Sequence, residues 1–190
     1  MSRLPTPTPP RPIGPVRTVA WWAVVGWVQW AFPGVPSLTT QALADWLSEG
    51  NAPLPILLDV RREYEFAVSH LPGAHRTPNR DAALALALDP RQPIVAYCSV
   101  GYRSARLVAQ LRQAGYTQVY NLEGSIFRWA NEGQSLVSQG HPVAVVHPFN
   151  PTWGLLLRPG LAVQSPRKPP RKLPWPGAPT GAGLRGDRHR

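Results

Sequence analysis

The sequence has few of the residues that build metal sites and disulfides. One of its 190 residues is a cysteine and one is a methionine. A single cysteine excludes a disulfide within the chain and a zinc site built on paired cysteines. No predicted strand is followed by a glycine-rich phosphate-binding pattern. We therefore expect neither a metal nor a cofactor.

The middle of the chain has almost no net charge. Residues 19–164 carry a net charge of +1, whereas residues 1–18 carry +3 and residues 165–190 carry +6, which accounts for the total of +10. The two ends also hold 12 of the 24 prolines. Segments of this composition bury too little apolar surface to fold alone, so we expect two disordered basic tails. They either have no partner or make weak contact with an anionic surface such as RNA or lipid.

The sequence also lacks an apolar run long enough to span a membrane. Residues 19–32 contain four of the eight tryptophans and no charge. As a helix they would extend about 21 Å, less than the ~30 Å hydrocarbon core of a bilayer. Pro33 and Gly34 follow, which indicates a turn rather than a signal-peptide cleavage site. We expect residues 19–36 to form a helix and a turn.

Two interpretations of this helix remain open. It either packs on the body of a cytoplasmic protein or lies in a lipid interface and makes the protein membrane-associated through residues 19–32. On a helix, its four tryptophans point in different directions around the axis. That spread favours a helix buried on several sides, and therefore the cytoplasmic interpretation.

The body, residues 37–137, alternates short apolar runs with helical periods. Continuous apolar runs followed by short connections are typical of buried parallel strands covered by helices on both faces. The patterns predict strands at 55–60, 93–97 and 117–124, and helices at 37–50, 61–70, 81–89, 103–115 and 125–133. We expect Thr39 or Thr40 and Asp81 to cap the first and third helices. Residues 138–164 are expected to form an extension packed on this domain.

Cys98 lies between the strand 93–97 and the helix 103–115, where parallel sheets place reacting groups. Gly101 can adopt backbone angles that turn several N–H groups of the loop toward the sulfur. The N-terminus of the next helix and the charge of Arg103 add positive potential. All of these favour the thiolate, so we expect the pKa of Cys98 to lie below the free value of about 8.5. The alternative is a buried, inert thiol, but polar residues, a glycine and an arginine follow it.

Two motifs resemble those of a known family. The run from Tyr97 to Gly124 resembles the active-site half of a rhodanese-type sulfurtransferase domain. The run from Leu58 to Ala74 resembles that family's other signature, with its Asp-Val-Arg start and its His-Leu-Pro-Gly-Ala end. The motifs have the expected order and separation, and the resemblance covers about 37–137. Ser69 replaces the family's usual glycine, a change that affects a turn and no chemistry.

The resemblance implies a rhodanese-like α/β fold with a mostly parallel five-stranded sheet. It implies that Cys98 takes a sulfane sulfur from a small anionic donor such as thiosulfate, or from a protein persulfide. The resulting persulfide would pass the sulfur to a thiol or protein acceptor, without a metal. The residues expected to bind the donor and stabilise the persulfide are Ser99, Val100, Gly101, Tyr102 and Arg103. Asp59, Arg61 and His70 are expected to give structural support. No sequence feature indicates an oligomeric state.

Sulfur transfer has two alternatives, a phosphatase-type reaction and a non-catalytic role. Phosphatases and arsenate reductases of related architecture separate the cysteine and the arginine by five residues. Here four residues separate Cys98 from Arg103, which gives a ring that suits a persulfide sulfur and crowds a phosphate. A non-catalytic rhodanese-like binding or scaffold module is the second alternative, but such modules typically lack the cysteine.

Overall fold

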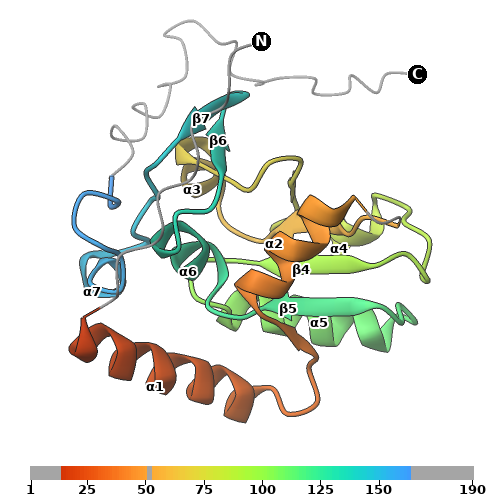
Figure 1. The fold of residues 1–190 in the computed structure, drawn as a ribbon. Helices are drawn as coiled ribbons and strands as arrows, with labels where there is room; N and C mark the ends of the chain where they lie inside the picture. The colour runs from red at the N-terminus through yellow and green to blue at the C-terminus, as the bar shows by residue number, and fades with distance from the viewer. Residues whose placement is uncertain (1–13, 51–52, 164–190) are drawn as a thin grey trace, which may run out of the picture.

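A parallel sheet forms the centre of the molecule. The structure, a computed structural model, describes residues 14–50 and 53–163. Most of the expected tails, 1–18 and 165–190, therefore lies outside the described residues. Helices cover both faces of the sheet, a long N-terminal helix lies along one side, and a β-hairpin projects from the opposite side (Figure 1).

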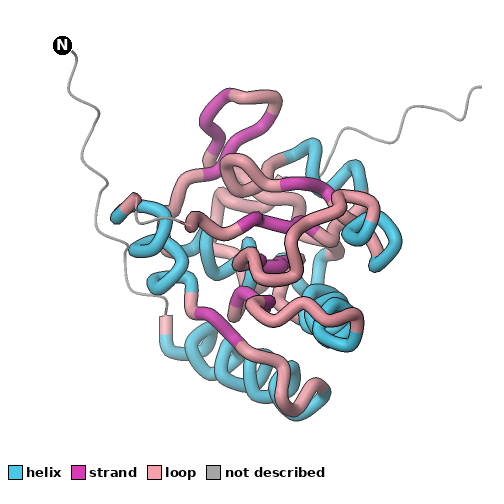
Figure 2. The backbone as a smooth tube through the Cα atoms, turned by 90° about the vertical axis from the view of Figure 1, so that its right-hand side faces the viewer, coloured by secondary structure: helices cyan, strands magenta, loops and turns pink. Residues whose placement is uncertain are grey.

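All five strands of the sheet run parallel, in the order β1-β5-β4-β2-β3. Their bounds are β1 Ser37–Leu38, β2 Ile56–Asp59, β3 His75–Arg76, β4 Ile94–Tyr97 and β5 Val119–Leu122. The register aligns Ala96 with Leu58 on one side and with Asn121 on the other. Figure 2 shows strands in the middle of the molecule with helices to either side. The predicted α/β class and five-stranded parallel sheet are confirmed.

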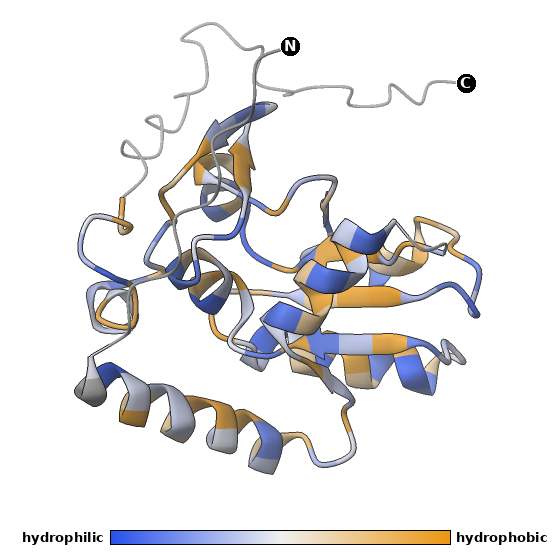
Figure 3. Ribbon diagram, viewed as in Figure 1, coloured by the Kyte–Doolittle hydropathy of each residue, from blue (hydrophilic) through white to orange (hydrophobic). Residues whose placement is uncertain are grey.

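Side chains of β4 alternate between two hydrophobic clusters, one on each face of the sheet. Val95 and Tyr97 belong to the cluster that includes helix α6, whereas Ala96 and Cys98 belong to the cluster that includes helix α5. All four residues of β4 are buried. In Figure 3 strand β4 is largely orange, as expected for a strand covered on both faces.

Four helices connect these strands, and a fifth follows β5: α2 Thr40–Glu49, α3 Glu63–Val68, α4 Arg80–Leu84, α5 Tyr102–Gln113 and α6 Ser125–Asn131. Thr39 caps α2 as predicted, since its hydroxyl accepts a hydrogen bond from the N–H of Ala42. The prediction for α4 is wrong at both ends. Asn79, not Asp81, caps this helix, because its side chain accepts from the N–H of Ala82. The helix ends at Leu84, and Ala87 then adopts a positive φ of 49°.

Helix α1, Pro15–Ala31, packs on the body through one face. It begins inside the segment 1–18 that we expected to be disordered, since proline is favourable in the first turn of a helix. Trp21 and Val28, two turns apart, are buried, whereas Trp22 and Trp30 are 75% and 80% exposed. The expectation of a helix buried on several sides is therefore wrong. Among the described residues, no helix has both the length and the apolar character needed to cross a bilayer.

The C-terminal extension begins with a hairpin of β6 Leu136–Ser138 and β7 His141–Val143. The hairpin thus starts two residues before the expected boundary at 138. After it, the chain forms the short helix α7, Pro151–Gly154. Val146, Leu156 and Leu157 join the hydrophobic cluster that contains α6. The extension therefore contributes to the core and brings its aromatic residues near the end of β4.

Candidate active site

Cys98 follows β4 and lies at the carboxyl end of the sheet, with 1% of its surface exposed. The N–H of Gly101 donates a hydrogen bond to its sulfur at 3.1 Å, and the N–H of Cys98 donates to the hydroxyl of Ser125 at 3.1 Å. Gly101 has a φ of 114°, which L side chains rarely adopt. The glycine thus allows the loop to fold back on the sulfur and to start α5.

Several groups act on the charge of the thiol. Burial by itself raises the pKa of Cys98. The charge of Arg103 and hydrogen bonds from the backbone of Ser104 and Gly101 lower this pKa by more than burial raises it, so the pKa lies below the ordinary value. The direction agrees with the sequence-based expectation of a thiolate-favouring loop. A thiol with a lowered pKa is a better nucleophile near neutral pH, because more of it is in the thiolate form.

Arg103 is held in place by Glu65 of α3, a residue that the sequence analysis missed. Arg103 Nη2 lies 2.9 Å from Glu65 Oε1, and Nη1 lies 3.0 Å from Oε2. Ser99 completes the group, since its hydroxyl accepts from Arg103 at 2.9 Å and donates to Glu65 at 3.2 Å. Glu65 also accepts from the N–H of Arg62, as an ordinary capping glutamate would. That local role hides its contact with a residue 38 positions away.

Val100 and Tyr102 of the predicted loop line the cavity and also pack against other parts of the protein. Val100 is 7% exposed and belongs to the hydrophobic cluster that contains α6. The ring of Tyr102 stacks on Trp27 of α1, with 4.6 Å between ring centroids. Cys98, Ser99, Val100, Tyr102 and Arg103 nevertheless all line one cavity.

The predicted supporting residues surround the neighbouring strand end. Asp59 and Arg61 are fully buried and form an ion pair of 2.6 Å, and Asp59 also accepts from the N–H of Arg61. Arg61 Nη2 donates to the carbonyl of Ser69 at 2.5 Å, which fixes the segment after α3. His70 stacks on Phe66 and its Nδ1 lies 3.1 Å from the carbonyl of Phe66. These contacts are structural and do not include Cys98.

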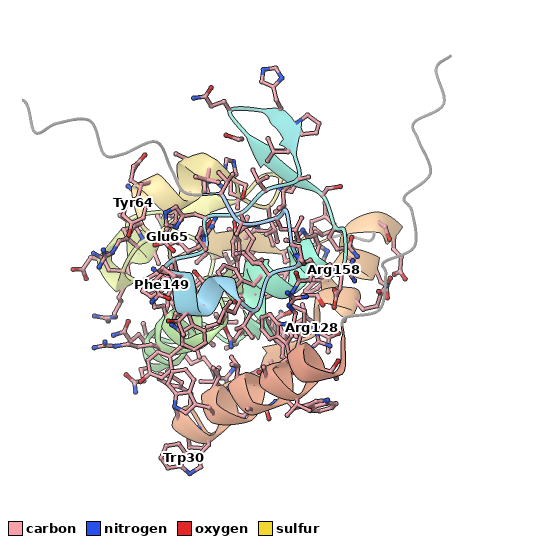
Figure 4. All side chains as sticks on the ribbon, turned by 90° about the vertical axis from the view of Figure 1, so that its left-hand side faces the viewer. Trp30, Tyr64, Glu65, Arg128, Phe149 and Arg158 are labelled. Atoms are coloured by element: carbon pink, nitrogen blue, oxygen red, sulfur yellow. The ribbon has the colours of Figure 1, made fainter. Side chains whose placement is uncertain are left out.

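The cavity next to Cys98 has a volume of about 180 Å³. Besides the loop residues, its wall contains three aromatic side chains that the sequence analysis did not assign to the site: Trp27, Phe149 and Trp153. They come from α1 and from the C-terminal extension. Figure 4 shows Phe149 and Glu65 on the same side of the molecule, with Trp30 at the end of α1. Within the described ranges, no group of three or more histidine, cysteine, aspartate or glutamate residues could hold a metal ion.

Sequence comparisons match the middle of the chain to one family. The rhodanese-like domain family matches residues 39–132. The chain is 34% identical over 84 residues to a sulfurtransferase from Allochromatium vinosum, an alignment that covers 44% of this chain and 78% of that protein. It is 34% identical over 102 residues to the probable adenylyltransferase/sulfurtransferase MoeZ of Mycobacterium tuberculosis, covering 52% of this chain. The alignment covers only 25% of the mycobacterial protein.

Solved structures show the same fold. The rhodanese-like domain of a protein from Anabaena superposes with a TM-score of 0.50 at 26% identity, covering 54% of this chain and 79% of that one. A thiosulfate sulfurtransferase from Pseudomonas aeruginosa gives a TM-score of 0.51 at 28% identity, covering 65% of this chain and 23% of that one. The family match contains four of the five strands of the parallel sheet and the cysteine loop, and the chain belongs to the rhodanese-like domain family.

Proposed function

We propose that this protein is a sulfurtransferase that carries a sulfane sulfur on Cys98. The observation that supports this most directly is the environment of the sulfur, which accepts a hydrogen bond from Gly101 and lies in the field of Arg103. Relatives named sulfurtransferases share the domain that contains this loop. The donor is thiosulfate or a protein persulfide, and the acceptor is a thiol or a protein sulfur acceptor.

The reaction has two displacement steps on sulfur. The Cys98 thiolate attacks the outer sulfur of the donor, the S–S bond of the donor breaks, and the leaving group departs with the electron pair, as sulfite when the donor is thiosulfate. The acceptor nucleophile then attacks the outer sulfur of the persulfide and releases the Cys98 thiolate. Backbone N–H groups of the loop stabilise the anionic persulfide, and no oxidant or reductant is consumed.

The test is sulfur transfer from thiosulfate to cyanide, followed as thiocyanate. Cys98→Ser should lose this activity by roughly a thousandfold or more, because the nucleophile is removed. Since the chain has one cysteine, the mass of one added sulfur atom after treatment with donor reports directly on Cys98. Trp30→Ala, at an exposed position on α1, is the matched control and should keep wild-type activity. Equal turnover of wild type and Cys98→Ser would contradict the role of Cys98, and a wild type that neither turns over nor gains sulfur would favour a non-catalytic binding module.

The cytoplasmic location is also part of this proposal. Burial of α1 on several sides no longer supports it, and it rests instead on the packing of Trp21 and Val28 against the body. Contact of the basic residues at both ends with RNA or lipid is a separate part of the proposal. Deletion of residues 1–13 and 164–190, followed by a measurement of vesicle binding, tests it.

A further inference from the structure

Four of the eight residues that line the cavity beside Cys98 are aromatic. Trp27 stacks on Tyr102 at 4.6 Å and lies 6.4 Å from Trp153, and Phe149 lines the same cavity. Three of these four residues lie outside the range 39–132 that matches the family. The thiol thus belongs to the shared domain, whereas three of the four aromatic residues of the wall lie in segments outside the family match.

The segment that carries Phe149 is built to hold its ring in this position. Phe149 has a φ of 63°, an unfavourable backbone conformation for a bulky residue. It is retained because the N–H of Phe149 donates to His147 and because Asn150 caps α7 through the N–H of Trp153. The ring lies against the guanidinium of Arg103, with 5.0 Å from Cζ to the ring centroid. The strain therefore coincides with a defined contact at the active site.

The charges at the site do not favour a dianionic donor. Arg103 is the cation nearest the sulfur among the cavity-lining residues, and both of its terminal nitrogens are bonded to the buried carboxylate of Glu65. With Cys98 as thiolate, two negative charges therefore share one positive charge. A dianion such as thiosulfate adds repulsion that a monoanionic or neutral donor avoids in part. Among donors of lower charge, contact with the aromatic wall then decides which one binds better.

We propose that the site selects an organic sulfur donor or acceptor that places a flat apolar group, such as an aromatic ring, beside its reacting sulfur. This inference rests on the proposed function of Cys98. The cavity of about 180 Å³ is comparable with the engineered apolar cavity of roughly 150 Å³ that binds benzene in another protein. Stacked and edge-to-face contacts with Phe149 and Trp153 would hold the ring and direct the sulfur toward Cys98.

A pair of monoanionic thiosulfonates tests this selection. In benzenethiosulfonate and methanethiosulfonate the same sulfane sulfur is bonded to a sulfonyl group, and the two differ in the phenyl or methyl substituent. The Cys98 thiolate attacks the outer sulfur, the S–S bond breaks, and benzenesulfinate or methanesulfinate leaves with the electron pair. Dividing the ratio of the two kcat/KM values by the same ratio for a free thiol in solution removes the difference in intrinsic reactivity.

Wild type should prefer the phenyl donor by about tenfold or more after this correction, as expected for one good aromatic contact. Phe149→Ala and Trp153→Ala should each reduce the corrected preference for the phenyl donor to within about threefold. Trp153→Phe, which keeps a ring, should retain much of the preference. Trp30→Ala, on the exposed face of α1, should keep all of it.

The outcomes separate this inference from the proposed function. If donors form the Cys98 persulfide but wild type and Phe149→Ala show the same corrected ratio, the selection by aromatic contact is wrong and the sulfurtransferase stands. If thiosulfate exceeds benzenethiosulfonate in kcat/KM, the charge argument is wrong as well. If no donor adds sulfur to Cys98, both proposals fail.

Discussion

Arg103 and Glu65 form a two-point ion pair in which the carboxylate is fully buried and the guanidinium is 32% exposed. The pair joins the start of α5 to α3, so the cation beside Cys98 is positioned by a residue from another part of the sheet edge. From the sequence we expected Arg103 to act on the donor anion. In the structure, Arg103 also neutralises the buried carboxylate of Glu65, so replacing Arg103 should lower the stability of the fold.

Replacing Arg103 by alanine should therefore change both stability and thiol reactivity. The free energy of unfolding should fall by about 2–4 kcal/mol, because a buried carboxylate loses its partner. The pKa of Cys98 should rise, since the nearby positive charge that favours the thiolate is gone. Urea unfolding and the pH dependence of Cys98 alkylation by iodoacetamide measure the two effects.

Two variants control this experiment. Arg103→Lys keeps the charge and should shift the pKa of Cys98 less than alanine does. Arg128→Ala removes an arginine that is paired with both Glu123 and Glu132 at a partly exposed site and should cost about 1 kcal/mol. An unchanged alkylation profile in Arg103→Ala would contradict the electrostatic role of Arg103.

Stability should depend on the charge of Glu65 at acidic pH. Burial by itself raises the pKa of Glu65. The hydrogen bonds and charge of Arg103 lower this pKa by more than burial raises it, so the pKa in the folded protein lies below the ordinary value of 4.5. The unfolded chain, with the higher pKa, binds the proton first as pH falls. The stabilisation by the carboxylate is therefore fully present above pH 4.5 and is lost as pH falls through the lower, folded pKa.

Glu65→Gln should accordingly be less stable than wild type near neutral pH, and the difference should narrow in acid. Urea midpoints between about pH 7 and about pH 3 measure it. Glu63→Gln is the matched control, because the Glu63 side chain is 76% exposed. Parallel curves for wild type and Glu65→Gln would show that the Glu65 carboxylate does not contribute in this way.

Gly101→Ala should impair catalysis more than stability explains. The φ of 114° is strained for any L residue, although the added Cβ would meet Asn121 Nδ2 at an ordinary 3.5 Å. We expect a loss of about 1–3 kcal/mol in stability. Relief of the strain would turn the Gly101 N–H away from Cys98, so kcat/KM should fall by roughly ten- to a hundredfold.

Gly133→Ala provides the comparison, since Gly133 also has a positive φ, of 76°, and nothing within 4 Å of an added Cβ. It should lose stability to a similar extent and keep its kcat/KM with thiosulfate. If both variants retain full activity, the hydrogen bond from Gly101 to the sulfur is not needed for transfer.

Deleting residues 1–13 and 164–190 should leave sulfur transfer within about twofold of wild type. Every residue that lines the cavity lies between Trp27 and Trp153. The deletion should instead remove binding to anionic vesicles at low salt, because most of the net positive charge lies in these segments. Extending the N-terminal deletion to residue 18 would remove the hydrogen bond from Arg17 to the carbonyl of Leu155 and should lower the melting temperature.

Vesicle co-sedimentation and thiocyanate release measure the two effects on the same samples. Retained vesicle binding after the shorter deletion would contradict the assignment of this binding to the basic ends. It would instead favour lipid contact through the exposed Trp22 and Trp30 of α1.

The sequence by itself predicted most of the sheet and the cysteine that we propose as the nucleophile. The continuous apolar runs around Leu58 and Ala96 indicate buried strands, and the glycine and the arginine after Cys98 indicate a loop that favours a thiolate. These features depend on interactions between residues a few positions apart. The same holds for the Asp59–Arg61 pair, whose members lie two residues apart and belong to one recognisable motif.

Tertiary structure alone decided the partner of Arg103 and the wall of the cavity. Glu65 reads locally as a capping residue of α3, and only the pairing of β2 with β4 brings it to the cysteine loop. Trp27 and Trp153 lie more than a hundred positions apart, and a sequence pattern carries no distance between them. The periodicity of α1 likewise could not show which face is covered, because that depends on the surface against which Trp21 packs.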